Sequence, residues 1–267
     1  MKRGAIVVAC VLFVLAGCSD DALNAAGGST SSSTAQATEL TIFAASSLTT
    51  AFKALAADFE AEHPGVTVTF NFGPSDGLAA QIESEGGADV FASASQTWMD
   101  DVEDKTGVTG RADFVTNELV VITPPDDPAG ISSLEDLGAE GVQVVLAAEG
   151  VPVGDYTRES LQSAGIDDAV LKNVVSNAED DAAVVATITS GEADAGIVYA
   201  SDVTADVAPA VRAVGIPDDV NVTATYPIAV VRDAADADLA QTWVDSLTTG
   251  EGQERLVGEF GFLPAAG

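Results

Sequence analysis

Apolar and polar residues alternate in two rhythms along most of the chain. Residues 40–44 form a short apolar run that is typical of a buried strand. Large apolar residues then recur at spacings of 4, 3 and 4, which places one apolar stripe on a helix: Leu48, Phe52, Leu55 and Phe59. Residues 66–72 change to strict alternation, which predicts a strand with one buried face.

The same succession of strand and helix continues to the end of the chain. Further strands are predicted at residues 89–93, 119–123, 142–147, 195–199 and 222–231, the last interrupted by Pro227. Further helices are predicted at residues 78–85, 96–105, from Pro152 onward, at 180–190, and in two closing helices that include 253–260. Alternating strands and helices predict open α/β sheets, and the length of the chain fits two such lobes.

Composition supports a folded chain with a strongly acidic surface. Hydrophobic residues make up 47% of the 267 residues, which is enough for a real core. The 42 Asp and Glu residues outnumber the 10 Lys and Arg residues, giving a formal net charge of −32. Such a surface repels nucleic acid, so we expect no nucleic-acid partner. An anionic ligand also looks unfavourable at this point.

The first residues contain a predicted export signal and a predicted lipid-attachment site. Lys2 and Arg3 precede the apolar residues 5–16, and the order Leu-Ala-Gly-Cys ends at Cys18. This layout predicts a signal peptide over residues 1–17 and resembles the bacterial lipobox, in which the Cys carries the lipid. Residues 18–39 are rich in Ser, Ala, Gly and Thr and are interpreted as a flexible tether.

Candidate binding chemistry lies in four turns that lead from a strand into a helix. These are residues 43–49, 71–78, 150–154 and 177–181. Each helix start offers unpaired backbone N–H groups and the positive end of a helix dipole. Several starts that converge form an anion site without Lys or Arg. Taken singly, each Ser in these turns is better explained as a plain helix N-cap, because such caps are common; the order of the motifs favours the binding interpretation.

The sequence gives little support to an enzyme. The chain has one histidine, His63, in a segment that ends a predicted helix, so a Ser-His-Asp arrangement would need this residue far from the Ser-rich turns. The two cysteines, Cys10 and Cys18, both precede the folded part, which excludes a Cys-ligated metal site there. No Lys-bearing phosphate loop is present. We expect no catalysis; an oxyanion-ester hydrolase is the alternative from this class.

The motifs occur in an order that is more specific than any one of them. The set comprises residues 43–49 (FAASSLT), 78–83 (LAAQIE), 88–93 (ADVFAS), 96–100 (QTWMD), 151–154 (VPVG), 196–202 (GIVYASD) and 226–231 (YPIAVV). Together they resemble the molybdate-binding proteins of ABC importers, and the resemblance covers almost everything from residue 40 to residue 264.

The resemblance implies a two-lobed periplasmic-binding-protein fold of type II. Each lobe is then an open sheet flanked by helices, with residues 40–120 plus 226–267 in one lobe, 121–225 in the other, and a two-strand hinge. It implies a monomer without a cofactor that captures molybdate or tungstate in the interlobe cleft. The partner is an ABC importer permease, and the protein lies in the cell envelope outside the cytoplasmic membrane, held there by the Cys18 lipid. Sulfate and phosphate remain alternative ligands.

The resemblance also assigns ligand-binding roles to five residues. Ser47 and Ser75 match hydroxyl donors, Val153 and Asp181 match backbone N–H donors, and Tyr199 matches a phenol donor. All of them contact oxygen atoms, so molybdenum enters only as the oxyanion. Two features depart from the family. Pro74 removes one N–H from the second turn, and Asp181 stands where an apolar side chain is common.

Overall fold

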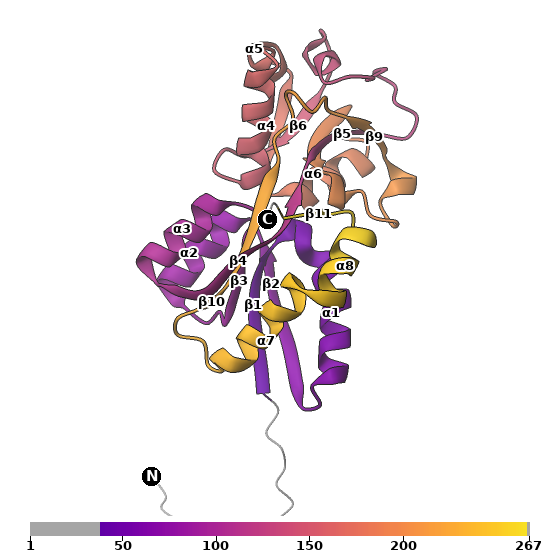
Figure 1. Cartoon of the computed structure of the whole chain (residues 1–267). Coiled ribbons are helices and arrows are strands. Elements are labelled where there is room, and N and C mark those ends of the chain that lie inside the picture. The colour runs from indigo at the N-terminus through magenta and orange to yellow at the C-terminus, as the bar shows by residue number, and fades with distance from the viewer. Residues whose placement is uncertain (1–37, 266–267) are drawn as a thin grey trace, which may run out of the picture. The chain divides into compact units, whose positions relative to one another are not determined.

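The computed structural model describes residues 38–265, which form two mixed β-sheets with helices packed on them (Figure 1). The predicted signal peptide, Cys18 and the tether as far as residue 37 lie outside the described residues. Strand β1 (Thr38–Ala45) already includes the last two residues of the predicted tether. Within residues 38–265, no helix is both long and apolar enough to cross a membrane.

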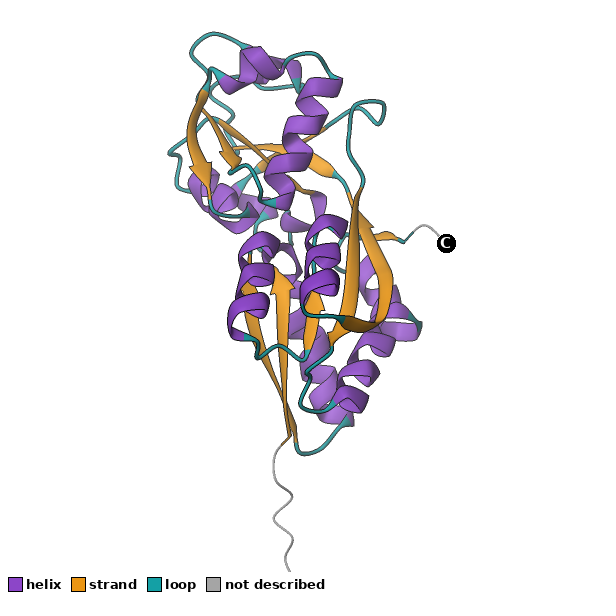
Figure 2. Cartoon of the chain, turned by 90° about the vertical axis from the view of Figure 1, so that its left-hand side faces the viewer, coloured by secondary structure: helices purple, strands orange, loops and turns teal. Residues whose placement is uncertain are grey.

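The first sheet has six strands. Their order is β11 (Leu263–Pro264), β4 (Val108–Asn117), β10 (Ala224–Val231), β3 (Val90–Ala92), β1 and β2 (Val66–Gly73). Strands β1, β2 and β3 are parallel, whereas β10 runs antiparallel to β3 and β4. Helices α2 (Ser75–Glu85) and α3 (Gln96–Lys105) cover one face. Helices α1 (Thr49–Glu62), α7 (Ala237–Thr248) and α8 (Gly250–Gly258) cover the other (Figure 2).

The apolar stripe predicted for the first helix is the surface that packs α1 against the sheet. Phe52, Leu55 and Phe59 are all buried. The Phe52 ring meets the edge of Trp243 from α7, with 5.6 Å between ring centroids. Aromatic pairs in this geometry add to the free energy gained from burial alone. The helical spacing read from the sequence is therefore confirmed as the core-facing side of α1.

The second sheet has five strands. Their order is β7 (Val174–Ala178), β6 (Val144–Ala147), β8 (Ala195–Tyr199), β5 (Leu119–Thr123) and β9 (Arg212–Gly215). Strands β6, β7 and β8 are parallel, and β5 is antiparallel to β8 and β9. Helices α4 (Pro152–Ser163), α5 (Asp167–Leu171) and α6 (Asp181–Thr189) accompany this sheet. Single 3-10 turns complete the lobe: η2 (Glu135–Gly138), η3 (Ala200–Asp202) and η4 (Ala208–Ala210).

The chain passes between the sheets twice. It leaves the first sheet after β4 and enters the second at β5, with Glu118 between them, and it returns between β9 and β10. The predicted fold, two helix-flanked sheets joined by two crossings, is confirmed. Leu119 and Val120 already pair in the second sheet and Ala224 and Thr225 in the first, so the sheets change two residues before each predicted lobe boundary.

No strand range was predicted for β4, β7, β9 or β11, and Pro227 was expected to interrupt β10. Strand β4 has no counterpart among the predicted strands, because its first six residues include Gly110, Arg111 and Asp113 with no apolar alternation. The strand forms because β10 pairs with it along most of its length, and β11 adds a second partner at Val115 and Thr116. Pro227 does not interrupt β10; it lies inside the strand at a register shift against β4, where a residue without N–H is tolerated.

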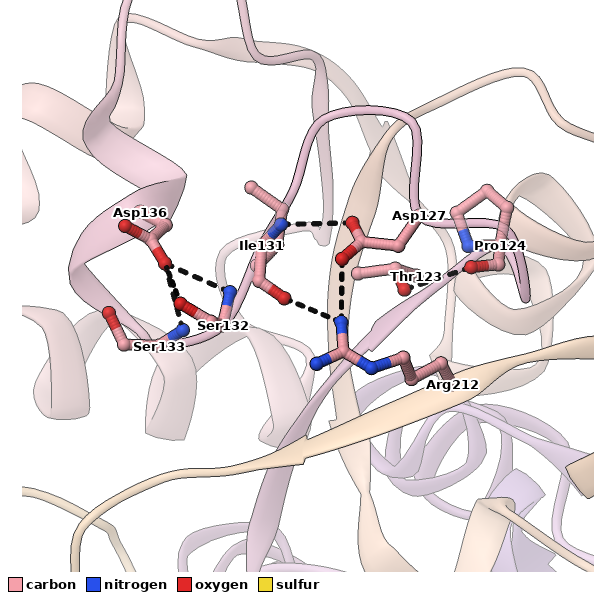
Figure 3. Close-up of polar contacts among 8 residues, drawn as sticks. All are labelled: Thr123, Pro124, Asp127, Ile131, Ser132, Ser133, Asp136 and Arg212. Atoms are coloured by element: carbon pink, nitrogen blue, oxygen red, sulfur yellow. Dashed lines mark hydrogen bonds and ion pairs between the residues drawn. The ribbon is translucent and has the colours of Figure 1, made fainter.

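The segment after β5 is fastened to the second sheet by carboxylates (Figure 3). Asp127 accepts a hydrogen bond from the Ile131 N–H (2.9 Å) and pairs with Arg212 of β9 (2.6 Å). Asp136 accepts bonds from the N–H groups of Ser132 and Ser133, and these bonds hold its pKa below the ordinary value. This segment lies apart from the strand ends that face the first sheet.

One indole connects the two lobes directly. Trp98 of α3 donates its Nε1–H to the carbonyl oxygen of Gly150, at 3.0 Å, in the loop that precedes α4. The side chain is partly buried there. The bond spans the opening between the lobes beside the start of α4.

The start of α4 depends on a glycine. A Cβ at Gly154 would lie 2.1 Å from the carbonyl oxygen of Ala148 and 2.7 Å from that of Ala147. Both atoms belong to the backbone and cannot give way cheaply. We therefore expect Gly154→Ala to lower the free energy of unfolding by about 1–3 kcal/mol, the usual cost of overpacking. Chemical denaturation of the purified domain measures it.

Gly77→Ala is the matched control, because both glycines are the third residue of their helix, α2 and α4 respectively. At Gly77 the nearest atom to a new Cβ is Pro74 Cγ at 3.5 Å, an ordinary contact. The free energy of unfolding should rise by about 0.4–1 kcal/mol there. Equal effects of the two substitutions would contradict the argument.

Candidate functional site

The predicted turns meet because parallel strands end at a common edge. Ala45 of β1 is paired with Gly73 of β2, and Ala147 of β6 with Ala178 of β7. The helices that follow these four strands therefore begin at the two sheet edges that face each other. In open α/β sheets this edge is where ligands bind.

A small cavity lies between these helix starts. It holds about 190 Å³ of space, part of it open to solvent. Only about 10 Å³ of it can hold the centre of a water molecule, far below the roughly 300–1,000 Å³ of pockets for drug-sized molecules. Its lining contains no Lys, Arg or His: Ala45, Ser46, Ser47, Gly73, Pro74, Ser75, Ala94, Val151, Pro152, Val153, Asp181 and Tyr199.

Two serines of the first lobe are oriented from behind. Ser75 is 1% exposed, and its Oγ accepts the Ala94 N–H at 3.0 Å, which leaves its own O–H free to donate. Ser47 Oγ lies 2.9 Å from the Tyr226 hydroxyl. Asn117 Nδ2 donates toward that hydroxyl at 3.4 Å, so the Tyr226 O–H can in turn donate to Ser47. Both serine hydroxyls can then donate into the cavity.

Tyr199 brings an unsatisfied donor to the same space. Its side chain is 1% exposed, and its hydroxyl has no hydrogen-bond partner among the described residues. Burial, followed by the nearby Tyr226 phenol, raises the pKa of Tyr199 well above 10.0. The pKa of Tyr226 is also raised well above 10.0, and burial is the largest cause. Both phenols therefore stay neutral O–H donors, and a buried donor without an acceptor is costly until a ligand supplies one.

Helices α4 and α6 present their N-terminal turns from the second lobe. Pro152 is the first residue of α4, where the fixed φ suits a helix start, and Val153 follows. In α6, Asp180 is the N-cap and its carboxylate accepts the Ala183 N–H at 2.8 Å. The remaining first-turn N–H groups, including those of Val153 and Asp181, have no backbone carbonyl acceptor within their own helix.

Asp181 is the one charged residue in the lining. Its side chain is 3% exposed, and its Oδ1 accepts a hydrogen bond from the Ser46 hydroxyl across the cleft. Its own backbone N–H also turns toward the carboxylate, and the carboxyl of Asp202 lies within hydrogen-bonding reach. Asp202 is itself held by the Tyr199 N–H, at 2.9 Å. Burial raises the pKa of both carboxyls. Asp181 raises the pKa of Asp202 further, whereas the hydrogen bond with Asp202 lowers the pKa of Asp181.

Hydroxyls, helix starts and phenols thus converge on a space too small for most metabolites. Neutral donors and helix dipoles of this kind bind anions without a cation. His63 takes no part in the cavity lining; it stacks on Phe59 with 4.1 Å between ring centroids and bonds to the Phe59 carbonyl oxygen near the end of α1. The arrangement is that of a binding site for a small anion.

The family model described as "Bacterial extracellular solute-binding protein" matches residues 40–263. The chain belongs to the bacterial extracellular solute-binding proteins. The Molybdate-binding protein ModA of Mycobacterium bovis is 34% identical over 240 residues, 90% of each chain. The protein of the same name from Escherichia coli is 36% identical over 204 residues, 72% of this chain and 77% of that one.

Solved structures agree on the architecture. The periplasmic molybdate-binding protein of Azotobacter vinelandii superposes with a TM-score of 0.70. It covers 85% of this chain and 100% of its own, at 18% identity. At that identity the likeness concerns the fold, which is the two-lobed fold of solute-binding proteins.

All five predicted site residues of this solute-binding protein line the cavity between the helix starts: Ser47, Ser75, Val153, Asp181 and Tyr199. Their contacts with a ligand stay a prediction. The carboxylate of Asp181 lies in the lining, where it accepts a hydrogen bond from the Ser46 hydroxyl. The site also contains residues that the sequence did not single out. Ser46 lines the cavity, while Tyr226, Asn117 and Asp202 position the residues that do.

The tyrosine side chains of this solute-binding protein predict how its stability changes at alkaline pH. The pKa values of all three tyrosines are raised above 10.0, while an unfolded Tyr ionises near pH 10. Their contribution to stability is thus complete below about pH 10 and is lost as the pH rises toward the folded-state pKa values. Near-ultraviolet titration should show phenolate absorbance only together with unfolding.

The same titration in denaturant supplies the control, with ordinary ionisation near pH 10. Tyr226→Phe should remove about a third of the final absorbance change, since the chain has three tyrosines. Phenolate absorbance in the folded protein at or below pH 10 would contradict the burial of these hydroxyls.

Proposed function

We propose that this chain captures molybdate or tungstate in the cavity between its two sheets and delivers it to an ABC importer. The observation that carries the proposal is the convergence of hydroxyl donors and helix starts on a cavity of about 190 Å³ whose lining has no cationic side chain. A compact dianion gains from every such donor. The relatives named for molybdate binding share about a third of their residues with this chain.

The donor set favours an oxyanion over a neutral or cationic solute. Ser47, Ser75 and Tyr199 each have an O–H that can donate into the cavity, and the first turns of α4 and α6 add backbone N–H groups. These donors come from both lobes, so a ligand that satisfies all of them holds the lobes together. We infer a monomeric binding protein with no cofactor and no catalytic role, which works outside the cytoplasm and hands the oxyanion to a permease.

Ser75→Ala and Ser47→Ala test the site. Each removes one hydrogen bond to a charged ligand, worth roughly 1.5–3 kcal/mol, so the Kd for molybdate should rise about 10- to 150-fold. Isothermal titration calorimetry with molybdate, tungstate, sulfate and phosphate measures the affinities and the order of preference. We expect one site per chain.

Ser84→Ala is the matched control, because Ser84 lies in the same helix as Ser75 but its hydroxyl bonds to the exposed Ala80 carbonyl. Its Kd should equal that of the parent. Ser75 also accepts the Ala94 N–H, so the unfolding transition of each variant is recorded beside the titration. Unchanged molybdate affinity in both site variants would show that these serines only cap helices, and no binding of any oxyanion by the parent would refute the proposed function.

We also propose that Cys18 carries a lipid that holds the protein at the cell surface. The support is the charged start, the apolar residues 5–16 and the Leu-Ala-Gly-Cys order in the sequence. Cys18→Ser should move the protein from the membrane fraction to the soluble fraction, because the remaining tether is polar. Cys10→Ser is the control and should leave the protein with the membranes. Retention of the Cys18→Ser protein in the membrane fraction would count against lipidation.

A further inference from the structure

Asp181 occupies the cavity as an internal anion. The Ser46 hydroxyl and the Asp181 backbone N–H both turn toward its carboxylate. These are donors that would otherwise face an oxyanion held at the start of α6 and the turn after β1. A hydroxyl has one proton to donate, so Ser46 cannot serve the carboxylate and the ligand at once. The bound dianion and the ionised carboxylate therefore compete for the same donors.

The second carboxyl oxygen of Asp181 has the surroundings of a protonated carboxyl group. Asp181 Oδ2 is buried and has no N–H or O–H donor among the described residues. The carboxyls of Asp181 and Asp202 interact with each other as side chains, and Asp202 is fixed by the Tyr199 N–H. Two carboxyls can form a hydrogen bond only when one of them is protonated, since a carboxylate is purely an acceptor. The pair is therefore arranged to hold at least one proton.

The surroundings of the pair contain no compensating cation. The elements packed on α6 are β5, β6, β7, β8, η3 and η1 (Ser46–Leu48). Their sequences contain no Lys, Arg or His. The titratable groups that face the pair are Asp180, the N-cap of α6, and two phenols, Tyr199 and Tyr226. Arg158 of α4 bonds instead to the carbonyl oxygens of Ala147 and Gly154 and to the Asn177 amide.

We propose that Asp181 couples oxyanion capture to proton uptake: a dianion enters with a proton that is held by the Asp181–Asp202 pair. This inference rests on the proposed function. Once protonated, Asp181 no longer repels the dianion, and its O–H can donate to Ser46 or to the ligand. Ser46 and the Asp181 N–H are then released to the oxyanion. A buried carboxylic acid acting as a neutral donor has precedent in enzyme sites.

The sign of the pH dependence follows from linkage. The dianion stabilises the protonated pair, so the complex binds more protons than the free protein. Affinity is therefore highest at low pH and falls as the pH rises above the pKa of the free pair. The fall reaches at most tenfold in Kd per pH unit, the limit for one proton taken up per ligand. Replacing Asp181 by an apolar residue removes both the competitor and the pH dependence.

The experiment is titration calorimetry with molybdate from about pH 7 to about pH 9, where the ligand itself stays a dianion. Each pH is measured in two buffers with different heats of ionisation. The difference in observed enthalpy gives the number of protons taken up on binding. For the parent we expect uptake of a measurable fraction of a proton, up to one, and a Kd that rises with pH.

Asp181→Val and Asp181→Asn should both take up no proton, and their Kd should change less than about twofold over the range. The Asn variant keeps the size of the side chain and an acceptor for Ser46, which guards against a folding defect in the Val variant. Asp180→Asn is the matched control: it removes the adjacent carboxylate, keeps a capping residue, and should preserve proton uptake.

The outcomes separate this inference from the function. If the parent binds molybdate with no buffer-dependent enthalpy, or if the Asp181 variants keep the proton uptake, the coupling is wrong and molybdate capture stands. If neither the parent nor the variants bind molybdate, tungstate or sulfate, the proposed function falls and the coupling falls with it.

Discussion

Everything in this site depends on the parallel register that ends neighbouring strands together. With Ala45 opposite Gly73 and Ala147 opposite Ala178, four helices begin within reach of one small space. Each helix start contributes roughly half a positive charge and unpaired N–H groups. A slip of one residue would turn the following side chains to the other face of the sheet and scatter these starts. The positive potential in an otherwise acidic molecule thus comes from backbone geometry and not from side-chain charge.

A layer of residues behind the lining decides which way the hydroxyls donate. Ser75 accepts from a backbone N–H, and Ser47 lies at the end of a chain from Asn117 through Tyr226. Each hydroxyl has one proton, so filling its acceptor position from behind directs that proton forward. Asp181 reverses this pattern on the opposite wall, where it draws the Ser46 proton away from the cavity. The two walls therefore respond differently to protonation.

The elements that could be predicted from the sequence are those in which burial against a single core fixes the spacing of the apolar residues. The stripe of α1 and the four strand-to-helix turns are examples, since their spacing follows directly from burial and capping. Strand β4 was not predicted, because Gly110, Arg111 and Asp113 interrupt the alternation of apolar and polar residues. Its pairing with β10 and β11 defines it as a strand. Similarly, the five site residues were assigned through resemblance, but the contact of Asp181 with Asp202 arises where η3 meets α6. No local pattern encodes such a contact between separate segments.

The two tryptophans differ in burial and in their contact with the other lobe, so the fluorescence of one can serve as a reference for the other. Trp243 is fully buried between Phe52 and Phe59 in the first lobe, so its emission should be indifferent to the position of the second lobe. Trp98 holds Gly150 across the opening through its indole N–H and is partly exposed. Separation of the lobes exchanges that bond for water and shifts the emission of this indole alone. The fluorescence of the chain should then combine one band that stays constant with one that reports whether the Trp98–Gly150 bond is made.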